Sequence, residues 1–343
     1  MKLKDLCEIF TCLSATAGDE FDACNYIAKY VSPYITMKTT KLGSLVGQIN
    51  PEGKGPHILI DAHIDQVGLI VRGIDEKGFI LFDKLGGIDE RVLVGSEVIV
   101  RGKEYLYGIV CSVPPHLSDD SDKTLKANKM AIDIGYDKAQ SEKLVEIGDR
   151  VILNSYLSSL LGDKLTSPAL DDRSAMAAIV QMLPHFYDEL KHCKVTIVFS
   201  SQEEVGCRGA KTALYGLEPD YAIAIDVGFG YNNNCKADET IKLGGGVSIG
   251  ISPVLDRKLG KELVELCKEY GLKYQHDVMP GRTGTNADEI SIAGAGVKTA
   301  LLSIPLRNMH TAVEVVSEKD LSAAGTLFYS FIMKKEAEFD ERA

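Results

Sequence analysis

Strand-forming and helix-forming segments alternate from residue 160 to the carboxyl terminus, and this alternation limits the possible folds more than any other feature. Residues 195–200 and 221–227 are short apolar runs typical of buried strands. Residues 257–270 place apolar side chains at helical spacing. Such alternation is typical of a parallel or mixed sheet with helices on both faces. We therefore predict an α/β fold with a mixed, mostly parallel sheet flanked by helices.

The pattern changes between residues 68 and 159, where short β-forming runs alternate with turns rich in Gly, Asp and Lys. This change predicts a small all-β domain at 68–159, inserted into the α/β domain. The α/β domain is then discontinuous and consists of residues 1–67 and 160–343. Within the insert, residues 123–130 form the most polar segment, and we expect them to be an exposed loop.

Composition excludes several classes of partner. The 343 residues include 49 acidic and 38 basic side chains, which give a net charge of -11. This charge repels nucleic acids and anionic membrane surfaces. No run of about 18 apolar residues predicts a spanning helix, and residues 1–10 lack the apolar centre of a signal peptide. The eight cysteines include no Cys-x-x-Cys pair, so we expect reduced thiols and a cytoplasmic location.

Five separate segments each place side chains that can bind metal at a predicted strand end or helix start. Any one of them alone has an ordinary structural explanation, such as a helix cap, a turn or a solvated loop. Their occurrence together is harder to explain without a metal site. The residues are His63 and Asp65 after 58–60, Asp171 before a helix, Glu203 and Glu204 after 195–200, Asp226 after 221–225, and His310 after 302–307.

The types of these residues indicate which metals could bind. Histidine together with carboxylate favours zinc, cobalt or manganese over calcium. Five ligands are more than one open tetrahedral zinc site needs, which points to two metal ions that share a bridging carboxylate. Neighbouring side chains at a strand end point to opposite sides, so Glu203 and Glu204 can have different roles. One could bind metal while the other transfers a proton as general base.

Five motifs resemble, in the same order, those of the dinuclear-metal aminopeptidases of the tetrahedral, or deblocking, type. This family is similar to glutamyl aminopeptidase, and its members are sometimes labelled endoglucanases. The resemblance extends from residues 14–20 to the terminal helix and implies a zinc-peptidase-like fold. The motifs are residues 62–65, 170–173, 202–210, 225–227 and 305–310.

The resemblance also implies a role for each candidate residue. His63 and Asp226 would bind one ion, Glu204 and His310 would bind the second, and Asp171 would bridge the two. Asp65 would orient His63, and Glu203 would be the general base for a water molecule activated by the metals. The implied cofactors are two divalent ions per subunit, with zinc or cobalt expected.

The expected substrates are peptides with a free amino terminus. The resemblance further implies that the β-rich insert is a dimerisation domain within a homo-oligomer, commonly a dodecamer. The sequence departs from the family pattern at Gln66, at residues 228–240 and at Asn286. None of these departures removes an expected ligand, so they concern substrate preference and metal affinity.

Three alternative functions remain open at this point. A deacylase or amidohydrolase would use the same metals on a different substrate. A glycosidase would use Glu203 with a second carboxylate, but it would leave His63 and His310 unexplained, and the chain has no Trp to form a sugar platform. A non-catalytic assembly protein is disfavoured because no expected ligand is missing.

Overall fold

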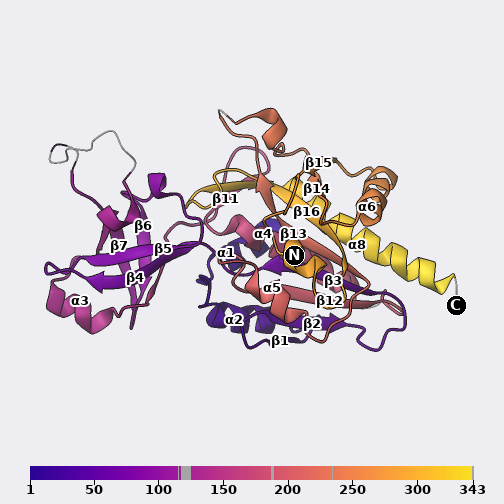
Figure 1. Ribbon diagram of the computed structural model, residues 1–343, viewed down its shortest axis with the longest axis horizontal. Helices are drawn as coiled ribbons and strands as arrows, with labels where there is room; N and C mark the ends of the chain where they lie inside the picture. Colours follow the sequence, from indigo (N-terminus) through magenta and orange to yellow (C-terminus); the bar gives the residue numbers. More distant parts are fainter. Residues whose placement is uncertain (115, 117–124, 187–188, 234, 342–343) are drawn as a thin grey trace.

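A large mixed sheet forms the centre of the protein (Figure 1). The computed structural model describes residues 1–114, 116, 125–186, 189–233 and 235–341. The strand order is β1-β2-β12-β3-β13-β16-β14-β15; β12, β3, β13 and β16 are parallel, whereas β2 and the β14–β15 pair run antiparallel to them. The predicted mixed, mostly parallel sheet is confirmed. The strands are β1 (Met37–Thr39), β2 (Leu45–Ile49), β3 (His57–His63), β12 (Lys194–Ser200), β13 (Tyr221–Phe229), β14 (Val247–Ile251), β15 (Tyr274–Val278) and β16 (Lys298–Leu306).

Helices cover both faces of this sheet because its central strands are apolar on both faces. Ile58 and Ile60 pack into the larger core, which also contains residues of α1, α4 and α8. Leu59, between them, points to the opposite face and packs with residues of α5 and α7. The helices are α1 (Leu3–Thr11), α2 (Phe21–Val31), α4 (Leu170–Phe186), α5 (Arg208–Ala213), α6 (Arg257–Glu269), α7 (Ala287–Ser291) and α8 (Glu318–Asp340).

A closed six-stranded barrel forms the narrower end of the elongated molecule (Figure 1). Its strands lie inside the range that the sequence analysis gives to an inserted all-β domain, and they enclose a separate apolar core. The strands are β4 (Gly68–Ile74), β5 (Ile80–Leu85), β6 (Glu97–Arg101), β7 (Tyr105–Cys111), β8 (Ala131–Asp133) and β9 (Arg150–Leu153), and the barrel also carries η1 (Glu90–Val92) and α3 (Lys138–Leu144).

The exposed loop predicted at residues 123–130 is wrong for its second half, while residues 123 and 124 lie outside the described residues. Residues Ala127–Lys129 form the short helix η3, and Ala127 and Met130 are buried in the barrel core. The main-chain N–H of Ala127 donates to the Glu90 carboxylate at 3.0 Å, and Lys126 pairs with the same carboxylate. These contacts explain how a polar segment packs against the barrel.

Several contacts join the barrel to the larger body. Arg101 of β6 pairs with Asp19 and with Asp22 at the start of α2. After the barrel, the chain forms a small sheet of β10 (Ser158–Ser159), β11 (Lys164–Ser167) and β17 (Glu314–Ser317), and β17 leads directly into α8. No helix among the described residues combines the length and apolar character that crossing a membrane requires.

Candidate active site

The predicted site residues meet at one edge of the large sheet. His63 is the last residue of β3, and Glu203 and Glu204 follow the end of β12. Asp226 lies near the carboxyl end of β13, and His310 follows β16. Because these four strands are parallel, their carboxyl ends converge. Asp171 joins them from the start of α4, ahead of its regular helical part.

Asp171 lies between the two histidines. Its Oδ1 is 3.0 Å from His63 Nε2, and its Oδ2 is 3.2 Å from His310 Nε2. His63 Nε2 is also 3.9 Å from the carboxylate of Asp226, and His310 Nε2 is 3.4 Å from that of Glu204. The result is two groups of three potential ligands that share Asp171.

Burial shifts the pKa values of the charged residues in this cluster. It raises the pKa of Glu204 and of Asp226 well above the usual values, and neighbouring negative charges add to the effect. Burial also acts to raise the pKa of Asp171, but hydrogen bonds from His310 and His63 hold it below its usual range. Burial acts to lower the pKa of His310, whereas Asp171 and Glu204 raise it to about 10.

The cluster fits divalent cations. Glu204 Oε1 is buried and has no hydrogen-bond partner among the described residues, so its lone pairs are free to bind an ion. Each group of three offers one imidazole nitrogen and two carboxylates, a donor set that suits zinc, cobalt and related ions. A cation would also offset the repulsion among these buried carboxylates.

Glu203 lies beside the same cluster. Its carboxylate accepts a hydrogen bond from the Cys207 thiol at 3.3 Å. Burial raises its pKa, and the negative charges of Asp171 and Asp65 act in the same direction. Glu203 is near enough to His63 and Glu204 to form a third potential ligand group, so it borders the two groups that share Asp171.

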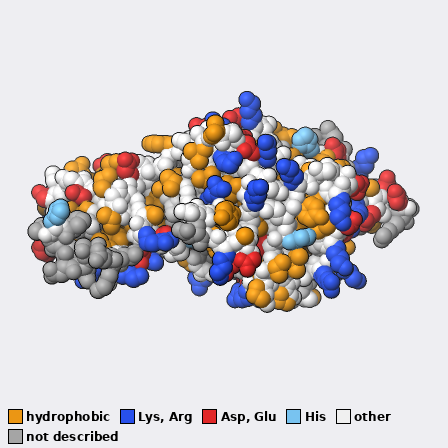
Figure 2. All heavy atoms as spheres, turned by 90° about the horizontal axis from the view of Figure 1, so that it is seen from above, with side chains coloured by type: hydrophobic (Ala, Val, Ile, Leu, Met, Phe, Trp, Pro, Cys, Tyr) orange, Lys and Arg blue, Asp and Glu red, His pale blue; other side chains and the backbone are white. Residues whose placement is uncertain are grey.

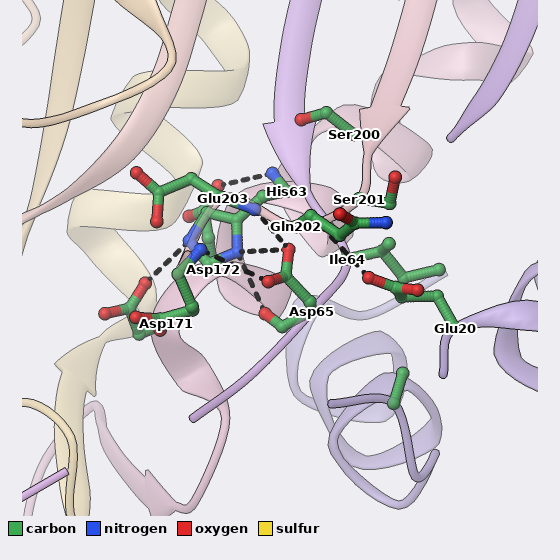
Figure 3. A network of polar contacts seen from close by, with 12 residues as sticks. Glu20, His63, Ile64, Asp65, Asp171, Asp172, Ser200, Ser201, Gln202 and Glu203 are labelled. Carbon is green, nitrogen blue, oxygen red and sulfur yellow. Dashed lines mark hydrogen bonds and ion pairs between the residues drawn. The ribbon is translucent and has the colours of Figure 1, made fainter. Parts of the chain in front are cut away.

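Asp65 holds the turn that carries the two glutamates (Figure 3). Its Oδ1 accepts the main-chain N–H of Glu203 at 2.9 Å, and its Oδ2 accepts that of Glu204 at 3.2 Å. Its contact with His63 is made mainly by the main-chain carbonyl, 2.9 Å from Nδ1, whereas the carboxylate is 3.7 Å from that nitrogen. Asp65 therefore supports both the histidine and the glutamate turn.

A second buried carboxylate, Glu20, binds the preceding peptide group. One oxygen of Glu20, Oε1, accepts the N–H of Gln202 at 3.1 Å and that of Gly18 at 2.9 Å (Figure 3). Gln202 has a φ of 56°, in the left-handed region that non-glycine residues rarely adopt. Glu20 and Asp65 thus bind three consecutive N–H groups and hold the backbone of the turn in this conformation.

Two further residues that organise the site were not among those predicted from the sequence. Glu314 is buried and accepts the main-chain N–H groups of Asp171 at 3.1 Å and of His310 at 2.8 Å, so it links two candidate ligands. Arg173 is fully buried and donates to main-chain carbonyls that include those of Ile64 and Ala15. Glu314 follows His310 by four residues, but this spacing alone does not indicate a supporting role.

The three departures from the family pattern have different surroundings. Gln66 is buried, and its main-chain N–H donates to the carbonyl of Ala15 at 3.0 Å. Asn286 is buried beneath the site and donates to Asp61 at 2.9 Å and to Ser200 at 2.7 Å. Residues 228–240 extend β13 and form η4 (Ala237–Glu239), and their described part borders a cavity of about 1240 Å³.

The cluster of potential ligands opens into a cavity of about 620 Å³. Its walls come from β13, β15 and β16 and from the segment before α7. Cavities of this size hold small ligands in many proteins. The site therefore combines potential metal ligands, a candidate general base and space for a substrate side chain.

Comparisons with known proteins agree with this reading of the fold. A lysyl aminopeptidase from Pyrococcus furiosus is 30% identical over 293 residues, which cover 83% of this chain and 83% of that relative. The structure of aminopeptidase APDkam598 from the archaeon Desulfurococcus kamchatkensis matches with a TM-score of 0.91 and 30% identity, covering 97% of this chain and 94% of the other. The Pyrococcus horikoshii TET1 peptidase, which can assemble into a tetrahedron or a large octahedral shell, matches with a TM-score of 0.84 and 31% identity, covering 96% and 99%.

The shared fold and the cluster at its sheet edge define a hydrolase of the peptidase class. The chain belongs to the M42 glutamyl aminopeptidase family, whose sequence pattern matches residues 43–327. The family is metal-dependent, in agreement with the groups of potential ligands around Asp171. The resemblance noted from the sequence motifs is thereby confirmed.

Proposed function

We propose that this protein is a two-metal aminopeptidase that removes amino-terminal residues from peptides, with Glu203 as its general base. The observation that carries the proposal is the position of Asp171, whose two oxygens face two different histidines. His63 and Asp226 would hold one ion, and Glu204 and His310 would hold the other. Zinc and cobalt suit this donor set.

When bound, the two ions would supply positive charge that polarises the scissile carbonyl and lowers the pKa of the attacking water. The carboxylate of Glu203 would accept the proton of that water as its oxygen attacks the carbonyl carbon. Glu203 then returns the proton to the leaving amine nitrogen as the C–N bond breaks. Burial raises the pKa of Glu203, and this makes the carboxylate a stronger proton acceptor.

The supporting carboxylates give the general base a fixed position. Asp65 binds the N–H groups of Glu203 and Glu204, so both peptide planes are oriented by one buried side chain. Glu314 links the main chain of Asp171 to that of His310. Such supporting hydrogen bonds orient ligands before an ion binds.

We also propose that the protein assembles into a homo-oligomer, with the barrel at an interface between subunits. Figure 2 shows hydrophobic side chains on the surface of the barrel and of the larger body. Ile147, Tyr156 and Leu161, in and after the barrel, are 79%, 74% and 96% exposed in the single chain, and exposed apolar side chains of this size favour association. The assembly of the Pyrococcus horikoshii relative supports the same proposal. Light scattering would test it, and a monomer mass at all concentrations would contradict it.

Metal analysis coupled to activity measurements tests the proposed reaction. The purified protein is assayed on aminoacyl-anilides and on N-acyl amino acids before chelation, after chelation and after metal is restored. We expect turnover of the aminoacyl compounds that chelation abolishes and added metal restores. Turnover of only the N-acylated compounds would identify a deacylase and overturn the proposal.

The Glu203→Gln variant tests the assignment of the general base. Glutamine keeps the shape of the side chain but cannot accept and return a proton. We expect this variant to retain both ions and to lose turnover by a factor of about 100 to 10,000. Full activity in a variant of verified metal content would show that another group acts as the base.

A further inference from the structure

The part of the cavity wall beyond the catalytic cluster combines apolar surface with one isolated negative charge. Phe229, Met279, Leu301 and Met309 are among its apolar members, and Asp277 of β15 is on the same wall. Phe229, Asp277 and Met309 also line the neighbouring cavity of about 1240 Å³. Asp277 therefore lies where the catalytic cavity and the larger cavity meet.

Two other charged residues of this wall are already paired. Arg282 Nε is 3.1 Å from the carboxylate of Asp288, and a second Arg282 nitrogen is 3.3 Å from Glu289. Asp288 also accepts hydrogen bonds from the main-chain N–H groups of Thr283 and Gly284. The charge of Arg282 is therefore matched by these two carboxylates and is not available to Asp277.

Asp277 differs from these residues in having no partner. Among the described residues, none forms a hydrogen bond or an ion pair with its carboxylate, which is half-buried in the cavity wall. Burial raises its pKa, and no neighbouring charge opposes this effect. An ionised carboxylate in such a place gains stability from a cation that enters the cavity.

We propose that Asp277 binds the cationic side chain of the amino-terminal substrate residue, so that the enzyme prefers peptides that begin with lysine or arginine. The methylene groups of such a side chain would pack on the apolar wall, and its charged end would pair with Asp277. An amino-terminal glutamate would instead face an unpaired negative charge. This inference depends on the proposed aminopeptidase function, since it assigns the substrate class of the same site.

The experiment compares anilides of lysine, norleucine and glutamate, using the metal-loaded enzyme. Norleucine has the same methylene chain as lysine but lacks the ammonium group, so the ratio of the two kcat/KM values isolates the charge. We expect lysine to exceed norleucine by about tenfold or more, the range of a hydrogen bond to a charged group. Asp277→Asn is expected to bring this ratio close to one while leaving the norleucine value within about threefold.

Asp238→Asn is the matched control. Asp238 is exposed and borders the larger cavity but not the catalytic one, so its removal lowers the negative charge nearby without changing the wall that faces the substrate. We expect this variant to keep the lysine preference. An equal loss of preference in both variants would indicate a general electrostatic effect and overturn the assignment to Asp277.

The outcomes separate this inference from the function on which it depends. Absence of turnover with every anilide would overturn the aminopeptidase function itself. Turnover without a lysine preference, or with a preference that survives Asp277→Asn, would overturn only the role of Asp277. A preference for glutamate would also overturn the role of Asp277. The wild-type ratio tests the inference even if the variant does not fold.

Discussion

Asp65 and Glu20 allow the same chemical change to be made at two points of one turn, with different expected results. Both are buried carboxylates that accept main-chain N–H groups next to Glu203. Asp65 uses both of its oxygens, one for each glutamate N–H. Glu20 uses a single oxygen, Oε1, for both of its bonds. An amide retains one acceptor oxygen, so it can replace Glu20 but not Asp65.

We expect Asp65→Asn to lower kcat by about 10-fold to 100-fold. The amide NH₂ group must face one of the two N–H donors, so one hydrogen bond to a charged group is lost, at a cost of about 1.5 to 3 kcal/mol. The turn shifts in response, and a displacement of about 1 Å in a catalytic group can lower the rate about 100-fold. Glu20→Gln keeps its acceptor oxygen in place, and we expect its kcat to fall by no more than about threefold.

The assay is steady-state turnover of an aminoacyl-anilide at saturating metal, with the metal content of each variant measured alongside. We expect a large difference in kcat between the two variants at equal metal content, because only Asp65 needs both of its oxygens. Similar losses in both would refute it, because they would show that the negative charge matters and the number of accepting oxygens does not.

Three further predictions concern the metal site, the effect of pH and the backbone. His310→Ala should reduce the bound metal by about one ion per subunit and abolish turnover, measured by elemental analysis and anilide assay. Burial raises the pKa of Glu20 from 4.5 to about 7 in the folded protein. Over this pH range the unfolded state releases the proton before the folded state does, so the free energy of unfolding falls as pH rises. Glutamine does not titrate, and the thermal midpoint of Glu20→Gln should therefore rise relative to that of wild type from about pH 4.5 to about pH 7. Gly244→Ala should lower the free energy of unfolding, measured in denaturant, by about 1 kcal/mol because Gly244 has a positive φ. Gly246 also has a positive φ, and a Cβ there would lie 1.9 Å from the Lys273 carbonyl oxygen, so Gly246→Ala should lower the free energy of unfolding by ~1–3 kcal/mol more than Gly244→Ala does.

Much of the large sheet could be predicted because its strands are local apolar runs. The runs at 195–200 and 221–227 lie within β12 and β13; Glu203 follows β12 as expected, whereas Asp226 lies inside β13, which continues to Phe229. Convergence at one edge then follows from parallel pairing, which brings His63 and Asp226 together although they are far apart in the sequence. The meeting of these four segments could therefore be inferred from strand ends, whereas Asp171 joins them from the start of α4.

Other elements were missed because a different signal was stronger. Residues 138–144 form α3 within a region whose turns and short runs favour strands. Their own signal was the capping box of Asp137 and Gln140, in which each side chain binds the main chain of the other residue. The burial of Ala127 was missed because its polar neighbours favour an exposed loop, and the contact with Glu90 that holds it is not local.

The supporting carboxylates are the hardest part of the site to predict, and the reason is physical. Glu20 binds Gln202, and Glu314 binds Asp171, across separations of 182 and 143 residues. A carboxylate that accepts main-chain N–H groups can serve any partner residue type, so the partner leaves no pattern in the sequence. The metal ligands are restricted in type by the ion, whereas the groups that fix their backbone are restricted only by geometry. Motifs therefore point to the residues proposed to carry the chemistry, and the structure is needed to show what holds them in place.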